Sequence, residues 1–173
     1  MINVKKYLDV RGCSVVDKKG NIIGRIEDFL IDINKLKIYS FIITTKNIFP
    51  TFNLLLIRDV EKYEDVIVIK NDIYKLNQSF IKKYKYIMLQ NFMDKEIIDI
   101  NGKRLGALND LIFDEFNGEL KALICKRGFY EDIFEGRKII IINEKTVFGK
   151  EKIIVDEDDI DITNIISFKN LVR

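Results

Sequence analysis

The chain has 173 residues, of which 47% are apolar and 32% are charged, and its formal net charge is +2. This composition is that of a globular protein and excludes a disordered chain. The absence of histidine excludes Ser-His and Cys-His nucleophile systems and removes the most common metal ligand. We therefore expect a protein that is not an enzyme, with no cofactor, no catalytic residue and no metal ligand.

The sequence shows no sign of a membrane or secretory protein. No apolar run approaches the ~20 residues that a membrane-spanning helix needs. The first residues, MINVKKYLDVRG, lack the apolar core of a secretory signal. A cytoplasmic location without integral membrane association is the expectation.

The organising feature is an internal repeat, because residues 15–43 recur as residues 97–125. The recurring positions lie 82 apart (99 − 17): Asp17, Gly20, Gly24, Asp28, Asp32 and Ile42 fall on Asp99, Gly102, Gly106, Asp110, Asp114 and Ile124. A period this long predicts two similar small domains in tandem and not a solenoid of short units. We expect domains at residues 1–70 and 88–160, a linker at 71–87 that is helical, and a C-terminal tail at 161–173.

In the first copy, short apolar and β-branched runs alternate with turn-forming clusters, which predicts strands. The predicted strands are residues 7–16, 22–33, 38–45, 54–57 and 66–69. Gly24 predicts a β-bulge. Residues 34–35 close a hairpin, residues 46–53 form a loop, and residues 58–65 form a polar turn segment with room for one helical turn.

The linker differs in character from the strands. Ile73, Leu76, Phe80 and Tyr84 recur at three- and four-residue spacing, which predicts a short helix. Its end carries a basic and aromatic cluster in which Lys82, Lys83 and Lys85 are candidate contacts to nucleic acid. A solvated helix end, whose lysines favour the C-terminal dipole, is the preferred interpretation of the same cluster.

The second copy repeats this order. Asn101-Gly102 and Asn117-Gly118 predict two-residue hairpin turns of type I′, since asparagine tolerates positive φ and glycine is indifferent to it. Strands at residues 139–142 and 153–155 follow a few residues later than their counterparts, which predicts an insertion within residues 126–138.

The repeated aspartates are the one carboxylate constellation to consider for acid–base chemistry or cation binding. Each lies beside a predicted turn, where an aspartate accepts hydrogen bonds from the neighbouring backbone. We therefore prefer a structural role. The acidic run at residues 156–161 lacks the glycine and the spacing of a calcium loop.

The segments GNIIGRIEDFLIDINKLKIYSFII and GKRLGALNDLIFDEFNGELKALI resemble the PRC-barrel family. The resemblance implies an all-β fold of two tandem small β-barrels, as in the reaction-centre H subunit and at the C-terminus of ribosome maturation factors. It is greatest to free-standing tandem PRC-barrel proteins of spore-forming and related bacteria. The family has no shared catalytic residues to transfer.

Two functions follow as hypotheses. The first is a non-enzymatic interaction or scaffold protein with a protein partner, in which self-association of the chain is an option. The second is an RNA-associated factor related to ribosome maturation or RNA processing. The RNA hypothesis is supported by the uneven charge distribution. Residues 1–87 hold 16 Lys/Arg and 10 Asp/Glu, whereas residues 88–173 hold 13 Lys/Arg and 17 Asp/Glu.

We place the candidate partner-binding surface in the loops that follow the third strand of each copy, where insertions are tolerated and function collects. The candidate residues are Phe49, Phe52, Phe129, Tyr130 and Phe134. Exposed aromatics would act as interface anchors. The equally weighted alternative is that these rings fold back into the open end of their own barrel.

Overall fold

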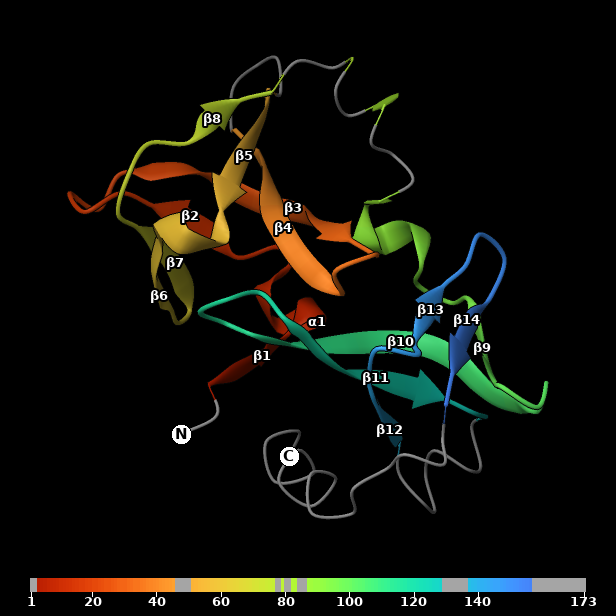
Figure 1. The fold of residues 1–173 in the computed structure, drawn as a ribbon. Coiled ribbons are helices and arrows are strands. Elements are labelled where there is room, and N and C mark those ends of the chain that lie inside the picture. The colour runs from red at the N-terminus through yellow and green to blue at the C-terminus, as the bar shows by residue number, and fades with distance from the viewer. Residues whose placement is uncertain are drawn as a thin grey trace. The chain divides into compact units, whose positions relative to one another are not determined.

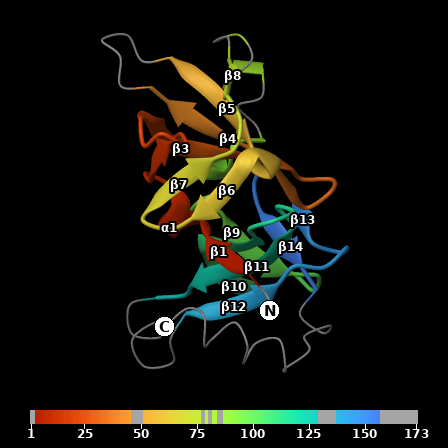
Figure 2. The ribbon, with the colours of Figure 1, turned by 90° about the vertical axis from the view of Figure 1, so that its left-hand side faces the viewer.

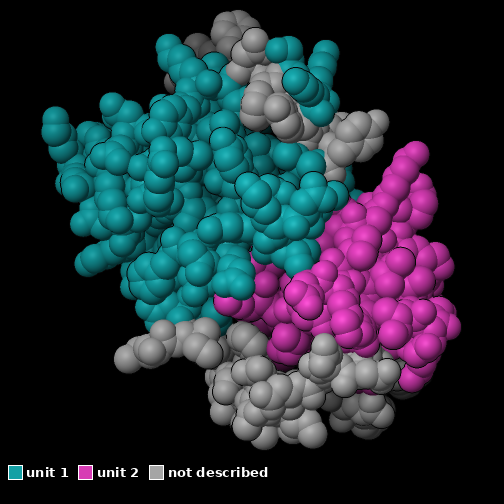
Figure 3. Space-filling model, in the orientation of Figure 1, with its two compact units in different colours: residues 1–91, 113–119 teal, residues 92–112, 120–173 magenta. Residues whose placement is uncertain are grey.

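The computed structural model describes residues 3–45, 51–76, 79, 82–83, 87–128 and 137–156. Nearly all of its elements are strands, which confirms the predicted all-β class (Figure 1). The chain divides into two compact units, coloured in Figure 3. Unit 1 is residues 1–91 and 113–119, and unit 2 is residues 92–112 and 120–173. Residues 87–91 and 113–119 therefore belong to unit 1 although they come from the second sequence copy.

Unit 1 is built on one sheet with the strand order β6-β7-β2-β3-β4-β5-β8 (Figures 1 and 2). Neighbouring strands are antiparallel except β2 and β7, which are parallel. The elements are β1 (Val4–Lys6), α1 (Tyr7–Val10), β2 (Ser14–Val16), β3 (Ile22–Asp32), β4 (Lys37–Thr44), β5 (Phe52–Leu56), the 3-10 helix η1 (Ile57–Asp59), β6 (Val60–Tyr63), β7 (Val66–Ile69), β8 (Tyr74–Lys75) and the 3-10 helix η3 (Leu89–Asn91).

Unit 2 repeats this arrangement, with the strand order β12-β11-β10-β9-β14-β13. Its strands are β9 (Glu96–Asp99), β10 (Arg104–Asp114), β11 (Leu120–Lys126), β12 (Lys138–Ile141), β13 (Val147–Phe148) and β14 (Ile153–Val155). The parallel pair β14 and β9 corresponds to β7 and β2. The two sequence copies therefore form the same central strand order.

The repeated glycines lie at matching β-bulges, as predicted for Gly24. Val15 pairs with Gly24 whereas the next residue of β2 pairs with Ile22, so β3 holds one extra residue at this point. The same shift occurs in β10 beside Gly106. A Cβ atom at Gly24 would lie 2.5 Å from the carbonyl oxygen of Thr44. A side chain at this position would thus collide with the neighbouring strand β4.

The core of unit 1 is aromatic, and one of its rings comes from the second copy. Phe29 meets Tyr7 at 4.9 Å and Phe41 at 4.6 Å between ring centroids. Phe113, at the end of β10, completes the cluster at 5.4 Å from Phe29. All four side chains are buried. Edge-to-face pairs of this kind add to the stabilisation from burial alone.

The prediction of closed barrels is wrong, because both sheets are open in the part of the chain that the structure describes. In unit 1 the outer strands β6 and β8 each pair on one side only. Closure would need a ladder between these two strands, and β8 has only two residues. In unit 2 the outer strands are β12 and β13.

The prediction of a helical linker over residues 71–87 is not confirmed. Tyr74 and Lys75 form strand β8, which pairs with β5 at Leu54 and Asn53. The edge of β5 offers hydrogen bonds that override the weak helical spacing of the linker sequence. Most of residues 77–86 lie outside the described residues. No helix in the described part of the chain is long and apolar enough to cross a membrane.

The predicted strand at residues 7–16 is also wrong in its first half. Tyr7–Val10 form the helical turn α1, and only Ser14–Val16 form a strand. Tyr7 and Val10 are both buried and lie three residues apart, which is the spacing of one face of a helix. Gly12, with a φ of 86°, then redirects the chain into β2.

The predicted type I′ turns differ from those observed. A type I′ turn requires positive φ at both central residues. Of each pair only the glycine has it, with φ of 83° at Gly102 and 75° at Gly118. In the first of these turns the Asp99 carboxylate accepts hydrogen bonds from the backbone nitrogens of Asn101 and Lys103, at 2.9 and 2.7 Å. The aspartate that precedes the turn therefore stabilises a different turn geometry.

Candidate functional site

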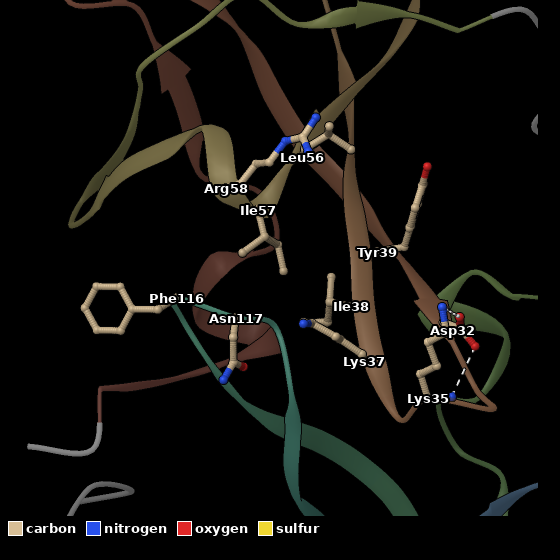
Figure 4. Close-up of a pocket in the computed structure, with 10 residues that line it drawn as sticks. All are labelled: Asp32, Lys35, Lys37, Ile38, Tyr39, Leu56, Ile57, Arg58, Phe116 and Asn117. Atoms are coloured by element: carbon tan, nitrogen blue, oxygen red, sulfur yellow. Dashed lines mark hydrogen bonds and ion pairs between the residues drawn. The ribbon is translucent and has the colours of Figure 1, made fainter.

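An open groove in unit 1 gathers cationic and aromatic side chains on one surface (Figure 4). Its volume is about 610 Å³. Three segments form it: the β3–β4 turn with the start of β4, the region of η1, and the tip of the β10–β11 hairpin. The lining residues are Asp32, Lys35, Lys37, Ile38, Tyr39, Leu56, Ile57, Arg58, Phe116 and Asn117.

Strand β4 supplies one cation and one aromatic ring. Side chains alternate between the two faces of a strand. Ile38 and Ser40 are buried, so Lys37 and Tyr39 point to the solvent side, where Tyr39 is 58% exposed. The alternation in the sequence KIYS thus places a lysine and a tyrosine together on the groove surface.

The η1 helix supplies Arg58. Its neighbours Ile57 and Asp59 are both buried, whereas Arg58 is exposed. The Asp59 carboxylate accepts a hydrogen bond from the Asn71 side chain at 2.8 Å, and its carbonyl accepts one from the backbone nitrogen of Lys70. These contacts fix the short helix with its arginine directed outward.

The hairpin tip supplies Phe116, which is 69% exposed. The Asp114 carboxylate accepts hydrogen bonds from the backbone nitrogens of Phe116 and Asn117, at 2.9 and 3.0 Å. The carbonyl of Gly118 accepts a hydrogen bond of 2.7 Å from the backbone nitrogen of Ile38 in β4. Two independent sets of contacts therefore hold the exposed ring beside the β4 surface.

Only some of the charged side chains in the groove form ion pairs. Lys35 pairs with Asp32 at 3.7 Å, as the dashed line in Figure 4 marks. Lys37 and Arg58 form no ion pair with any residue in the described ranges. Figure 4 shows Tyr39 and Phe116 at opposite sides of these cations. The groove therefore presents positive charge between two exposed rings.

A second groove continues from the first, because Ile57, Arg58 and Phe116 line both. Its charges are mixed, with lysines and glutamates along β6 and around it. Lys5 donates a hydrogen bond of 3.0 Å to the Tyr63 carbonyl and lies 3.7 Å from Glu115. Lys62 and Lys70 of the second groove also form no ion pair among the described residues, but this groove contains Glu64 as well, whereas the one carboxylate of the first groove, Asp32, is already paired.

The repeated aspartates at turns have structural roles. The Asp17 carboxylate accepts hydrogen bonds from the backbone nitrogens of Lys19 and Asn21, and from the Asn21 side chain. The hydrogen bond from the Asn21 side chain is the main reason that the pKa of Asp17 lies below its ordinary value. Asp32, Asp99 and Asp114 accept turn hydrogen bonds in the same way. These carboxylates stabilise turns.

Asp28 is different because it is buried within unit 1. It accepts a hydrogen bond of 3.0 Å from the Tyr7 hydroxyl and contacts of 3.3 Å from the backbone nitrogen of Gln90. Burial raises the pKa of this carboxyl, and the hydrogen bonds oppose the shift. Its counterpart Asp110 is also buried and accepts from the backbone nitrogen of Leu111. Over the described residues, no cluster of three or more acidic or cysteine side chains could hold a metal ion.

The structure describes only part of the sequence-predicted binding residues. Phe52 is the first residue of β5, half-buried, and packs against the cluster of Leu30, Ile42 and Met88. Lys82 and Lys83 are exposed. The other candidates, Phe49, Lys85, Phe129, Tyr130 and Phe134, lie outside the described residues.

The groove residues were not predicted from the sequence, although two of them carry a signal. Phe116 is a large aromatic residue inside a predicted turn, where a ring has no core to enter. Tyr39 alternates with Ile38 and Ser40 and therefore lies on the opposite face of the strand. Lys37 and Arg58 have no signal of their own, because surface cations are common.

Comparison with known proteins identifies one family. The sequence model described as the PRC-barrel domain matches residues 3–73 and again residues 87–162. No curated protein matches the chain. The two matches correspond to the two copies found by the internal repeat.

Proposed function

The chain belongs to the PRC-barrel domain family in both of its copies, and we propose that it is a non-enzymatic interaction protein that binds a protein partner in the groove of unit 1. One observation carries the proposal. Lys37 and Arg58, without an ion pair among the described residues, lie between the exposed rings of Tyr39 and Phe116. Arginine and aromatic residues are the side chains most enriched in interface hot spots.

The exposed rings favour a macromolecular partner. Tyr39 and Phe116 leave more than half of their surface in water. Rings of this size provide a large contact area at a low cost in side-chain entropy. The backbone hydrogen bonds at Phe116 and Gly118 hold the hairpin in place before binding. Such preorganisation reduces the entropy lost on association.

The chemistry of the groove supports binding over catalysis. Its one carboxylate, Asp32, accepts two backbone hydrogen bonds and pairs with Lys35. General acid–base catalysis needs a titratable group free to exchange a proton with a substrate. The chain also has no histidine. A non-catalytic role in the cytoplasm is part of the proposal.

A capture experiment with matched charge changes tests the proposal. The double variant Lys37→Glu/Arg58→Glu removes the unpaired cations of the groove. The control Lys19→Glu/Lys75→Glu makes the same change in net charge at exposed positions of unit 1 outside this groove. After cross-linking in an extract of the native cell, one protein should be retained by the wild-type chain and the control but not by the groove variant. Retention that is equal for all three chains would refute the groove as the binding site.

RNA association is the second candidate, favoured by the exposed side chains of Lys82 and Lys83. Binding through phosphate contacts weakens steeply as salt concentration rises. A salt titration of the full chain against total RNA tests it. A steep salt dependence that is lost in Lys82→Glu/Lys83→Glu would support RNA binding, and salt-independent or undetectable binding would exclude it.

A further inference from the structure

We infer that the groove binds an extended acidic segment of a protein, in which Asp or Glu side chains alternate with apolar ones. This inference rests on the proposed function and specifies the partner that the groove selects. It draws on three features of unit 1. These are the pattern of paired and unpaired charges, the alternation of polar and apolar groove residues, and the acidic side chains of the adjoining groove.

The pattern of paired charges favours an anionic ligand. The one carboxylate that lines the groove, Asp32, already pairs with Lys35, and in the adjoining groove Glu61 pairs with Lys18 and Glu115 with Lys5. Lys37 and Arg58 have none among the residues described. A carboxylate brought to either cation would form a charge-assisted hydrogen bond without displacing an existing ion pair. A cationic segment in this groove would find only the carboxylate of Asp32, which is already paired with Lys35.

The apolar groups favour a segment that also carries apolar side chains. Ile38 and Ile57 line the groove with only a small exposed fraction, 2% and 7%. Tyr39 and Phe116 stand at its two sides. An extended chain directs successive side chains to opposite faces, and residues on one face repeat about every 7 Å. Alternating acidic and apolar residues would therefore meet the cations and the rings in turn.

The acidic groups around the groove disfavour a nucleic acid. A single-stranded RNA carries a phosphate at every nucleotide, so it requires a continuous positive track. Beyond Arg58 and Phe116, the adjoining groove alternates in charge, with Glu61, Glu64 and Glu115 among Lys5, Lys62 and Lys70, so the positive surface is not continuous. A long polyanion would have to pass these carboxylates. A short acidic segment can end before them, which makes a peptide the better match.

Selection from a random peptide library displayed on phage, with the full chain as bait, tests the inference without assuming a sequence. We expect the selected peptides to be enriched in Asp and Glu beside aromatic or aliphatic residues. A fluorescent copy of a selected peptide should bind about tenfold or more weakly to Lys37→Glu/Arg58→Glu, and with unchanged affinity to Lys19→Glu/Lys75→Glu. Circular dichroism confirms that each variant is folded.

A charge-swap measurement separates a direct contact from a structural effect. If the carboxylates of the peptide contact Lys37 and Arg58, a peptide in which every Asp and Glu is replaced by Lys should bind the groove variant better than it binds the wild-type chain.

Three outcomes would overturn the inference: selected peptides without acidic residues, a failed selection, or affinities that the groove variant does not change. If groove-dependent capture from the cell extract persists, only the acidic specificity is wrong. If groove-dependent, steeply salt-sensitive binding to an oligouridine probe is found instead, the proposed function fails as well.

Discussion

The ring of Phe113 lies edge-on to the ring of Phe29, with centroids 5.4 Å apart and planes at 90°. Phe29 belongs to the first sequence copy and Phe113 to the second. Phe113 also contacts Phe41 and Tyr63, each at 6.4 Å between centroids. The β10–β11 hairpin tip therefore completes the core of unit 1 and presents Phe116 to the groove. Stability and the candidate binding site depend on the same short segment.

Replacing Phe113 by alanine should lower the free energy of unfolding by about 3–5 kcal/mol, because a fully buried ring is lost and a cavity remains. Phe116→Ala, three residues further along the same hairpin, should change it by less than about 0.5 kcal/mol, because that ring is 69% exposed. Urea unfolding of both variants provides the measurement. A loss for Phe113→Ala as small as the one expected for Phe116→Ala would contradict the role of Phe113 in the core.

Two buried tyrosines should respond in opposite ways to removal of the hydroxyl. The Tyr7 hydroxyl donates to Asp28 at 3.0 Å, so Tyr7→Phe should cost about 1–3 kcal/mol. The Tyr63 hydroxyl is buried and has no hydrogen-bond partner among the described atoms. Tyr63→Phe should therefore leave the stability unchanged or raise it by up to about 1 kcal/mol. Thermal melting of the two variants compares these effects, and a larger loss for Tyr63→Phe would contradict both assignments.

Asp28 should make stability decline as the pH rises. Burial raises its pKa in the folded state above the ordinary value of 3.8, so the folded state holds the proton more tightly than the unfolded state. The contribution of this group to stability is then greatest below pH 3.8 and is lost as the pH rises through the folded pKa. Asp28→Asn does not ionise, so its stability relative to the wild-type chain should increase over that window.

Asp17 provides a control with the opposite sign. Hydrogen bonds from Asn21 and Lys19 lower its pKa in the folded state, so its contribution is present above the ordinary pKa and is lost as the pH falls. Asp17→Asn should therefore be less stable than the wild-type chain near neutral pH, and the difference should shrink in acid. Urea midpoints measured across the acid and neutral range would show the two opposite slopes. Parallel slopes would refute the prediction.

The internal repeat predicted the parts of the fold that depend on local geometry. The glycines at 24 and 106 and the aspartates beside the turns have the same backbone roles in both copies. The agreement extends to Gly12 and Asp94, which occupy equivalent positions in the two copies but differ in residue type. Both have positive φ, at 86° and 66°. Local turns and bulges are determined by a few neighbouring residues, and a repeated sequence therefore repeats them.

Long-range pairing was not predictable in this way. The parallel pairing of β2 with β7 joins segments about fifty positions apart, which the hydrophobic pattern of either strand does not reveal. The same limit applies to the groove. The turn at Asn117-Gly118 was predicted, but its contact with Ile38 of the first copy depends on tertiary packing. Exposed cations such as Arg58 form a candidate binding site only because this tertiary packing brings the hairpin tip beside them.

The last prediction concerns Gly118, which links the hairpin to the groove. Gly118 and Gly102 both have positive φ, at 75° and 83°. A Cβ atom at Gly102 would meet nothing within 4 Å, so Gly102→Ala should cost only the backbone strain, roughly 1–2 kcal/mol. At Gly118 the same atom would lie 2.8 Å from the Ile38 carbonyl oxygen and would also collide with the Ile57 side chain.

Gly118→Ala should therefore cost about 2 kcal/mol more than Gly102→Ala, because the hairpin must move away from β4. The movement displaces Phe116 while leaving Lys37 and Arg58 unchanged in sequence. We expect Gly118→Ala to weaken binding of a groove-selected peptide severalfold and Gly102→Ala to leave it unchanged. Urea unfolding and fluorescence anisotropy measure the two effects on the same samples. If Gly118→Ala loses stability but retains full affinity, the position of Phe116 does not matter for binding, and the contact surface is limited to the β4 and η1 side of the groove.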